Sequence, residues 1–222
     1  MISRSNLADL NGKLESRGAR LVAVSKTQPP AAILPLYEAG LRLFGENRVQ
    51  ELLEKQSALP QDVEWHLIGH LQRNKVRSIA PFVAMIHSVD SERLLEEVHR
   101  QADKIGRTIP VLLQVHIAQE ESKFGWSAAE LELWLASGQW KQYPNAQIHG
   151  LMGMATFTDN RDQVRMEFRS LRQLFERLNA DVFAQADAFC ECSMGMSGDW
   201  EIAVEEGATL VRIGSLLFGE RA

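Results

Sequence analysis

The segment LVAVSKTQPP, residues 21–30, decides how the rest of the chain is interpreted. Four apolar residues precede Ser25 and Lys26, and a turn with two prolines follows. This pattern is typical of a short buried strand that enters a loop before a helix near Pro30. Lys26 is therefore expected at the carboxyl end of a strand, half inside the protein. Because an isolated lysine at such a place usually buries its stem and keeps its ammonium in water, the other strands must show whether Lys26 has a chemical role.

Seven further strand patterns follow, separated by segments with helical periodicity. The predicted strands are residues 21–25, 41–44, 65–68, 84–88, 110–116, 148–152, 189–193 and 210–212. Alternating strands and helices, without a Pro-, Gly- or Ser-rich linker, predict an α/β fold. We expect a (β/α)8 TIM barrel that forms a single domain over residues 1–222, with an extra helix within residues 1–20. A doubly wound open sheet is the alternative, but the motif GxGxxG does not follow the first strand.

Charge and composition narrow the class of protein. The 222 residues carry a net charge of -5, which argues against a surface for nucleic acid or anionic lipid. No apolar segment approaches the roughly 18 residues of a membrane span, and the amino terminus has no signal-peptide core. We therefore expect a cytoplasmic protein that binds neither nucleic acid nor membrane. Cys190 and Cys192 are expected to be reduced residues of the core.

Two segments rich in glycine and serine stand out near the carboxyl terminus. CSMGMSGDW (residues 192–200) and VRIGSLLFG (residues 211–219) each pass from a predicted strand through glycine and serine toward a helix. Free backbone N–H groups and serine hydroxyls at such turns suit a phosphate group. The two segments belong to strands seven and eight, whose loops are the usual phosphate site of TIM barrels.

A phosphate site that faces a strand-end lysine indicates pyridoxal 5'-phosphate, whose aldehyde would form a Schiff base with Lys26. The amine must be neutral to react, and burial would lower the pKa of Lys26. Arg212, two residues before Gly214, would reach the pyridine nitrogen and keep it unprotonated. This would weaken the ring as an electron sink.

Longer motifs carry a resemblance to a known family. They are AVSKTQP (23–29), LFGENRVQE (43–51), WHLIGHLQRNK (65–75), HSVDS (87–91), GLMGM (150–154) and the segment 193–221 that begins SMGMSGDW. Through these motifs the chain resembles the pyridoxal phosphate homeostasis proteins, single-domain relatives of the alanine racemase N-terminal barrel. The resemblance implies a type III pyridoxal phosphate fold in which Lys26 is the Schiff-base lysine.

The resemblance also assigns residues to the cofactor. It implies that the phosphate is held by Ser197, Gly214 and Ser215, that the pyridine nitrogen faces Arg212, and that the ring is lined by Asn47, Ser193 and Met194. His116 stands where the family usually has asparagine, within VHIAQEESKFG (115–125), and Lys123 lies in the same segment. The change to His116 would affect only the local hydrogen bonding near the ring edge, and Lys123 is either an exposed loop cation or a functional residue.

Three other polar residues have simpler interpretations. His66 and His70 are spaced for one helical face, but residues 65–68 are predicted as strand, so ordinary hydrogen bonding is expected in place of a zinc site. Glu191 shares a side of its strand with Ser193 and would lie one layer deeper in the barrel, where it needs a partner.

Two functions remain for the site. The resemblance implies a protein that binds, buffers and delivers pyridoxal 5'-phosphate, with little or no turnover and with apo forms of dependent enzymes as candidate recipients. The alternative is a small pyridoxal phosphate-dependent racemase, which needs a second base. Tyr37 and Tyr143 are the only tyrosines, and neither follows a predicted strand. The missing base favours the binding protein, for which we expect a monomer. A barrel for a sugar phosphate with Lys26 as an aldolase-type amine is a third possibility, but it does not explain Arg212.

Overall fold

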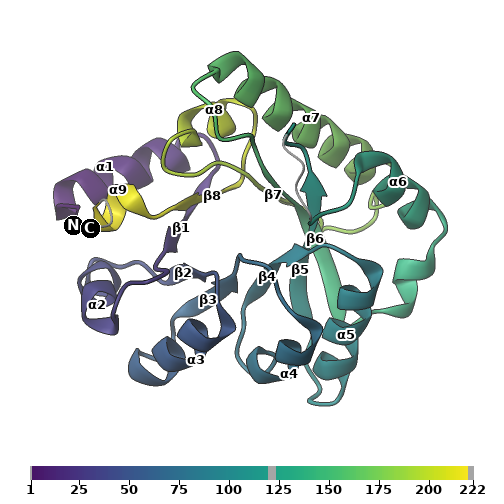
Figure 1. The fold of residues 1–222 in the computed structure, drawn as a ribbon, viewed down its shortest axis with the longest axis horizontal. Helices are drawn as coiled ribbons and strands as arrows, with labels where there is room; N and C mark the ends of the chain where they lie inside the picture. The colour runs from purple at the N-terminus through teal and green to yellow at the C-terminus, as the bar shows by residue number, and fades with distance from the viewer. Residues whose placement is uncertain (1, 120–123, 220–222) are drawn as a thin grey trace.

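The apolar runs of the sequence form the strands of a closed barrel. The structure is a computed structural model that describes residues 2–119 and 124–219. Eight parallel strands pair in chain order, and the last strand pairs with the first (Figure 1). They are β1 Arg20–Val24, β2 Leu43–Glu46, β3 Glu64–Leu67, β4 Met85–Val89, β5 Ile109–His116, β6 Ala146–Met154, β7 Glu191–Ser193 and β8 Leu210–Ile213.

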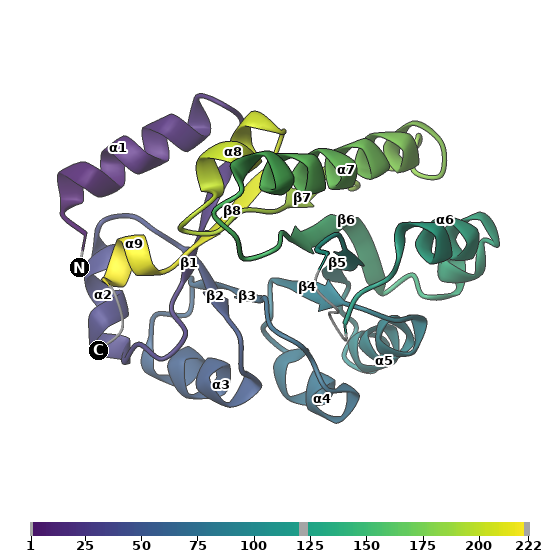
Figure 2. The same ribbon diagram turned by 45° about the horizontal axis from the view of Figure 1, so that its top comes forward.

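Helices surround the barrel in both views of the chain (Figures 1 and 2). Between the strands lie α2 Pro30–Glu38, α3 Val49–Ala58, η1 Arg73–Lys75, α4 Val76–Ile79, α5 Glu92–Asp103, α6 Ala128–Ala136, η2 Gln139–Gln142, α7 Arg161–Ala180 and α8 Trp200–Glu205. The extra helix α1 Arg4–Glu15 precedes β1, and the short α9 Ser215–Phe218 follows β8. The backbone N–H of Ile2 donates to the carbonyl of Leu217 at 2.7 Å, so the segment before α1 is tied to α9.

Alternation along the strands separates the barrel interior from the layer under the helices. On β1, Leu21 and Ala23 belong to the large core between strands and helices, whereas Val22 belongs to a small separate cluster. The members of this second cluster all lie on strands: Val22, Leu43, Met85, Leu112, Met152 and Leu210. Because successive strand side chains point to opposite faces, these residues fill the barrel interior. Residues two positions further along each strand also point inward, toward the carboxyl face.

The fold predicted from the sequence is confirmed. All eight predicted strands are present with ends within two residues, and the leading helix occupies residues 4–15. The prediction for the cysteines was half wrong, because Cys190 precedes β7 and is exposed, whereas Cys192 is buried. Burial raises the pKa of the Cys192 thiol to about 12, so this thiol stays protonated at neutral pH. None of the helices in the described part of the chain is long and apolar enough to cross a membrane.

Candidate functional site

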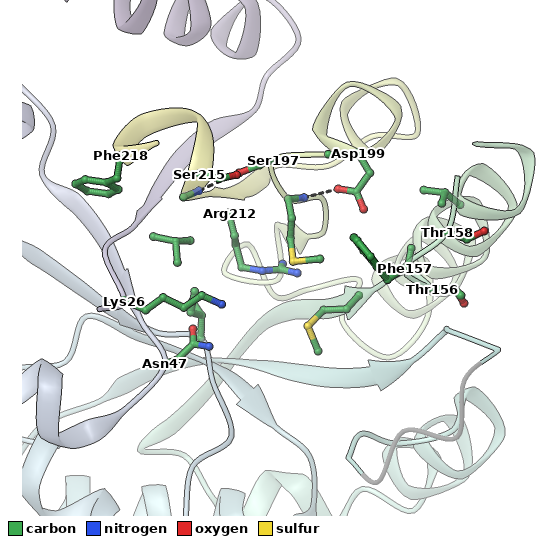
Figure 3. A pocket seen from close by; sticks show the side chains of 18 of the residues that line it. Lys26, Asn47, Thr156, Phe157, Thr158, Ser197, Asp199, Arg212, Ser215 and Phe218 are labelled. Carbon is green, nitrogen blue, oxygen red and sulfur yellow. Dashed lines mark hydrogen bonds between the residues drawn. The ribbon is translucent and has the colours of Figure 1, made fainter. Parts of the chain in front are cut away.

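A cavity of about 530 Å³ opens at the carboxyl ends of the strands (Figure 3). This volume lies within the range of small-molecule sites. The structure brings together six of the residues singled out in the sequence, because each follows or ends a different strand or shares a loop with one that does. Those that line the cavity are Lys26, Asn47, Ser197, Arg212, Gly214 and Ser215.

Lys26 enters the cavity from the end of β1. It lies two residues beyond Val24, which itself lines the cavity, so strand alternation directs its side chain inward. Figure 3 shows the Lys26 amine pointing into the pocket, with Asn47 beside it and Arg212 across from it. Lys26 is half-buried, as expected from the sequence.

Arg212 forms the floor of the cavity and is held from below. Its side chain is buried, Nη2 donates to the carbonyl of Gly153 at 3.0 Å, and Nη1 donates to Oγ of Ser193 at 2.7 Å. Burial lowers the pKa of Arg212 to about 10, while the charge of Asp199 opposes this effect. The guanidinium therefore remains charged at neutral pH and presents a fixed donor to the cavity.

A chain of hydrogen bonds continues from Arg212 into the barrel. Ser193 Oγ lies 3.0 Å from Nδ1 of His87, and Nε2 of His87 lies 2.8 Å from Nδ1 of His66. Both histidines are buried, and burial lowers the pKa of His66 to about 3 and that of His87 well below its usual value. These two imidazoles are therefore neutral at physiological pH.

The direction of this chain follows from Arg212, which can only donate. Ser193 accepts from the guanidinium, so its hydroxyl hydrogen is available for Nδ1 of His87. The proton of neutral His87 then resides on Nε2 and is donated to Nδ1 of His66. This series of hydrogen bonds gives Arg212 an acceptor that carries no negative charge. The positive charge of the guanidinium is therefore not neutralised from this side and can act on a group in the cavity.

The loops after β7 and β8 meet at the wall of the cavity opposite Asn47. Ser197 Oγ accepts from the backbone N–H of Gly214 at 3.2 Å, which joins the two loops. Gly195 has φ +89°, and a Cβ there would lie 2.5 Å from Cβ of Ala203, so only glycine fits this turn. Ser215 is exposed at the start of α9. The hydroxyls and N–H groups of this wall suit an anionic group.

Two of the eight residues assigned to the cofactor do not line the cavity. Met194 is fully buried in the core between strands and helices. Ser193 is buried and accepts a hydrogen bond from Arg212, which does line the cavity. His116 is half-buried at the end of β5 and lies outside the cavity lining, while Lys123 lies outside the described residues.

The remaining polar residues match their simpler interpretations. His66 bonds to His87, and His70 Nδ1 lies 3.1 Å from Asp90 Oδ2. Within residues 2–119 and 124–219, no cluster of three His, Cys, Asp or Glu side chains could hold a metal ion. Glu191 has the partner it was expected to need, because Arg20 and the hydroxyl of Thr209 donate to its carboxylate.

Sequence reasoning missed the side of the cavity that follows β6. Thr156, Phe157, Thr158 and Asp159 line it together with Asp199 from the loop before α8. Burial raises the pKa of Asp199, whereas the N–H of Met196, 2.5 Å from Oδ1, and the charge of Arg212 lower it. The sequence offered one sign that these residues belong to the site, because Thr156 and its neighbours follow a predicted strand. Loop residues without any function also follow strands, so this position alone could not identify them.

The site lies in a closed (β/α)8 barrel and combines a lysine at the end of β1, an arginine on β8 and a glycine–serine wall after β7 and β8. These features define the class of alanine racemase N-terminal barrels. The family model that matches is the alanine racemase N-terminal domain, over residues 3–222. The chain belongs to the pyridoxal phosphate homeostasis protein family. The relative from Aquifex aeolicus is 44% identical over 205 residues, which cover 91% of this chain and 87% of the relative. The human relative is 40% identical over 212 residues, which cover 91% and 76%.

Solved structures agree with this assignment. PipY of Synechococcus elongatus without PLP superimposes with a TM-score of 0.88 at 41% identity, covering 97% of this chain and 99% of PipY. PipY with PLP bound gives a TM-score of 0.84 at 40% identity, with the same coverage. Alanine racemase from Bartonella henselae, at 20% identity and a TM-score of 0.71, shares the fold over 98% of this chain and 60% of the racemase. The family predicted from the sequence motifs is confirmed.

Proposed function

We propose that this protein binds pyridoxal 5'-phosphate as a Schiff base on Lys26, and that it buffers and delivers the cofactor inside the cell with little or no turnover. The observation that carries the proposal is the meeting of three groups in one cavity: the Lys26 amine, the charged Arg212 and the Ser197–Gly214 wall. The name of the family and the PLP bound in the PipY structure support it.

Each group of the cavity has a role in this proposal. Ser197, Gly214 and Ser215 hold the phosphate, Asn47 lies along the ring, and Arg212 donates to the pyridine nitrogen. Ser193 contributes through Arg212, and Met194 belongs to the buried core next to the loop that carries Ser197. Bound cofactor supplies an electron sink for amino-group chemistry. A donor that stays charged keeps the pyridine nitrogen unprotonated, so the Arg212 guanidinium limits this sink.

The surroundings of the tyrosines favour a carrier over a racemase. Tyr37 donates to Asp62 at 2.7 Å and Tyr143 donates to Glu92 at 3.1 Å, and neither lines the cavity. A racemase needs an acid or base on each face of the cofactor, and tyrosine is one of the side chains that can serve.

We further propose that residues 1–222 form one cytoplasmic domain that acts as a monomer, binds no nucleic acid, and passes the cofactor to apo enzymes.

Absorption spectra test the proposal. Purified protein mixed with pyridoxal 5'-phosphate should show the visible band of a Schiff base, and Lys26→Ala should lose it. Lys13→Ala, which removes an exposed lysine of α1, should keep the band. Absence of the band from the wild type would overturn the Schiff base. Rapid loss of optical purity of any proteinogenic amino acid would instead favour the racemase.

A further inference from the structure

A buried ion cluster lies directly behind the backbone of the cavity lysine. Nζ of Lys55 on α3 is 2.6 Å from Oε1 of Glu46, and both side chains are buried. The hydroxyl of Ser25 donates to the same carboxylate oxygen at 2.6 Å. Oε2 of Glu46 is buried without a hydrogen-bond partner among the described residues. Because a buried ion pair with an unsatisfied oxygen is a poor source of stability, the cluster needs another explanation.

The cluster holds the residues on both sides of Lys26. Nζ of Lys55 donates to the carbonyl of Ser25 at 2.8 Å. Oε2 of Glu51 accepts from the backbone N–H of Thr27 at 2.6 Å. Glu51 and Lys55 are one turn apart on α3, with Oε2 and Nζ separated by 3.4 Å. One face of one helix therefore fixes the backbone immediately before and immediately after the lysine.

The backbone at Thr27 is strained. Its φ is +65°, and Thr27 is the one non-glycine residue with positive φ in the described part of the chain. A β-branched residue is a genuine outlier in this region, and such a conformation persists only where its surroundings impose it. Two contacts hold it here: the backbone N–H of Thr27 donates to the carboxylate of Glu51, and the backbone N–H of Gln28 donates to the carbonyl of Ser25 at 3.0 Å, which closes a turn with Thr27 at its third position.

We propose that Glu51 and Lys55 are positioning residues for Lys26. Neither lines the cavity, so both act through the backbone of Ser25 and Thr27. By holding the end of β1 in its strained turn, they direct the Lys26 amine toward the point between Asn47 and Arg212 (Figure 3). The proposal rests on the proposed function for the identity of the ligand, but it makes a separate claim about how the amine is placed.

Two ligands separate positioning of the amine from general integrity of the cavity. Pyridoxal 5'-phosphate has an aldehyde that can bond to Lys26, whereas pyridoxine 5'-phosphate has an alcohol at the same carbon and cannot. Glu51→Ala should weaken binding of pyridoxal 5'-phosphate by about tenfold or more, the scale of one hydrogen bond to a charged group. It should leave the affinity for pyridoxine 5'-phosphate within about twofold of the wild type, since the wall for the phosphate is intact.

Matched variants complete the experiment. Glu51→Gln keeps an oxygen that can accept from Thr27, so it should recover most of the lost affinity. Glu54→Ala removes an exposed carboxylate of the same helix and should change neither affinity. Lys55 is unsuitable for substitution, because its loss would leave Glu46 as an unpaired buried charge and would disturb folding. Circular dichroism would confirm that each variant is folded.

Every outcome bears on a defined claim. If Glu51→Ala lowers the affinity for pyridoxal 5'-phosphate and for pyridoxine 5'-phosphate equally, or changes neither affinity, the positioning role is wrong while cofactor binding stands. If wild-type protein binds neither ligand, the proposed function itself fails. If pyridoxal 5'-phosphate alone is affected and Glu51→Gln restores it, Glu51 acts on the amine through the backbone.

Discussion

Thr27 illustrates how one backbone angle contributes to the site. Its positive φ lies directly after Lys26, and the carboxylate of Glu51 holds it through the N–H bond. Residues in such conformations cost on the order of 1–3 kcal/mol, and they cluster where geometry matters for binding or chemistry. Nothing in the segment SKTQ marks Thr27 as unusual, so the sequence could not have predicted this strain.

Replacing Thr27 by glycine should relieve the strain. Glycine adopts positive φ without a Cβ clash, which gains about 1–2 kcal/mol, but it adds chain entropy to the unfolded state worth roughly 0.5–1 kcal/mol. We expect the free energy of unfolding of Thr27→Gly, measured with urea, to rise by up to about 1.5 kcal/mol. Thr108→Gly, where φ is not positive, should instead lower it. A loss at Thr27 as large as at Thr108 would show that no strain is present.

The tautomers of the two histidines beneath Arg212 can also be predicted. The donor direction from Arg212 through Ser193 assigns the Nε2–H tautomer to His87 and, through the His87–His66 bond, to His66. Nitrogen NMR of labelled protein without cofactor distinguishes the two tautomers. We expect the spectrum of an unprotonated Nδ1 at both residues at pH 7. A proton on Nδ1 of His87 would contradict the assigned direction of the chain.

At the scale of elements, the strand ends were predictable and their lateral contacts were not. The apolar run before Lys26 and the glycines near Arg212 marked β1 and β8 because proline, glycine and serine end strands in sequence-visible ways. The contact between His66 and His87 joins residues 21 apart and exists only because β3 and β4 are neighbours in the barrel. Likewise, Glu51 and Lys55 have the spacing of an ordinary exposed helical pair, but the barrel buries the lysine.

The approach of two loops offers a test at this scale. Gly69, after β3, lies so close to the residue after β2 that a Cβ would be 2.4 Å from the carbonyl oxygen of Asn47 and 2.8 Å from its Cα. The clash would be with backbone atoms, which can move apart only at a greater cost than the end of a flexible side chain. Gly69→Ala should therefore lower the free energy of unfolding by about 1–3 kcal/mol. Because Asn47 lines the cavity, we also expect weaker binding of pyridoxal 5'-phosphate.

Gly12 of α1 provides the control for this substitution. A Cβ at Gly12 would meet no atom within 4 Å, and the residue lies in the interior of a helix. Gly12→Ala should therefore raise the free energy of unfolding by about 0.5–1 kcal/mol. Urea denaturation of both variants gives the comparison. If Gly69→Ala were as well tolerated as Gly12→Ala, the close contact between the loops would be wrong.

At the scale of the whole molecule, the neutral histidines make stability depend on pH. The folded pKa of His66, about 3, and that of His87 lie below the ordinary value of 6.5, so the unfolded chain binds protons first as the pH falls. The stability that depends on keeping these two histidines neutral is therefore fully present above pH 6.5, and it is lost progressively as the pH falls below this value. The free energy of unfolding should fall by about 1 kcal/mol per pH unit for each histidine between pH 6.5 and pH 5.

Comparison with His66→Gln isolates this effect from other groups. Glutamine can accept from Nε2 of His87 but does not titrate, so the variant should lose one histidine's share of the pH dependence. Urea denaturation at pH 7.5, 6 and 5 measures both proteins. Equal slopes for the wild type and the variant would show that His66 is not kept neutral by the fold.

The whole barrel brings residues from the first and last strands to one cavity, and the central claim is that Lys26 holds the cofactor there covalently. Borohydride reduction of protein loaded with pyridoxal 5'-phosphate, followed by digestion and peptide mass mapping, tests it most directly. We expect one modified peptide, with the added mass on Lys26. An adduct on a different lysine, or no adduct on a protein that binds the cofactor, would contradict the account.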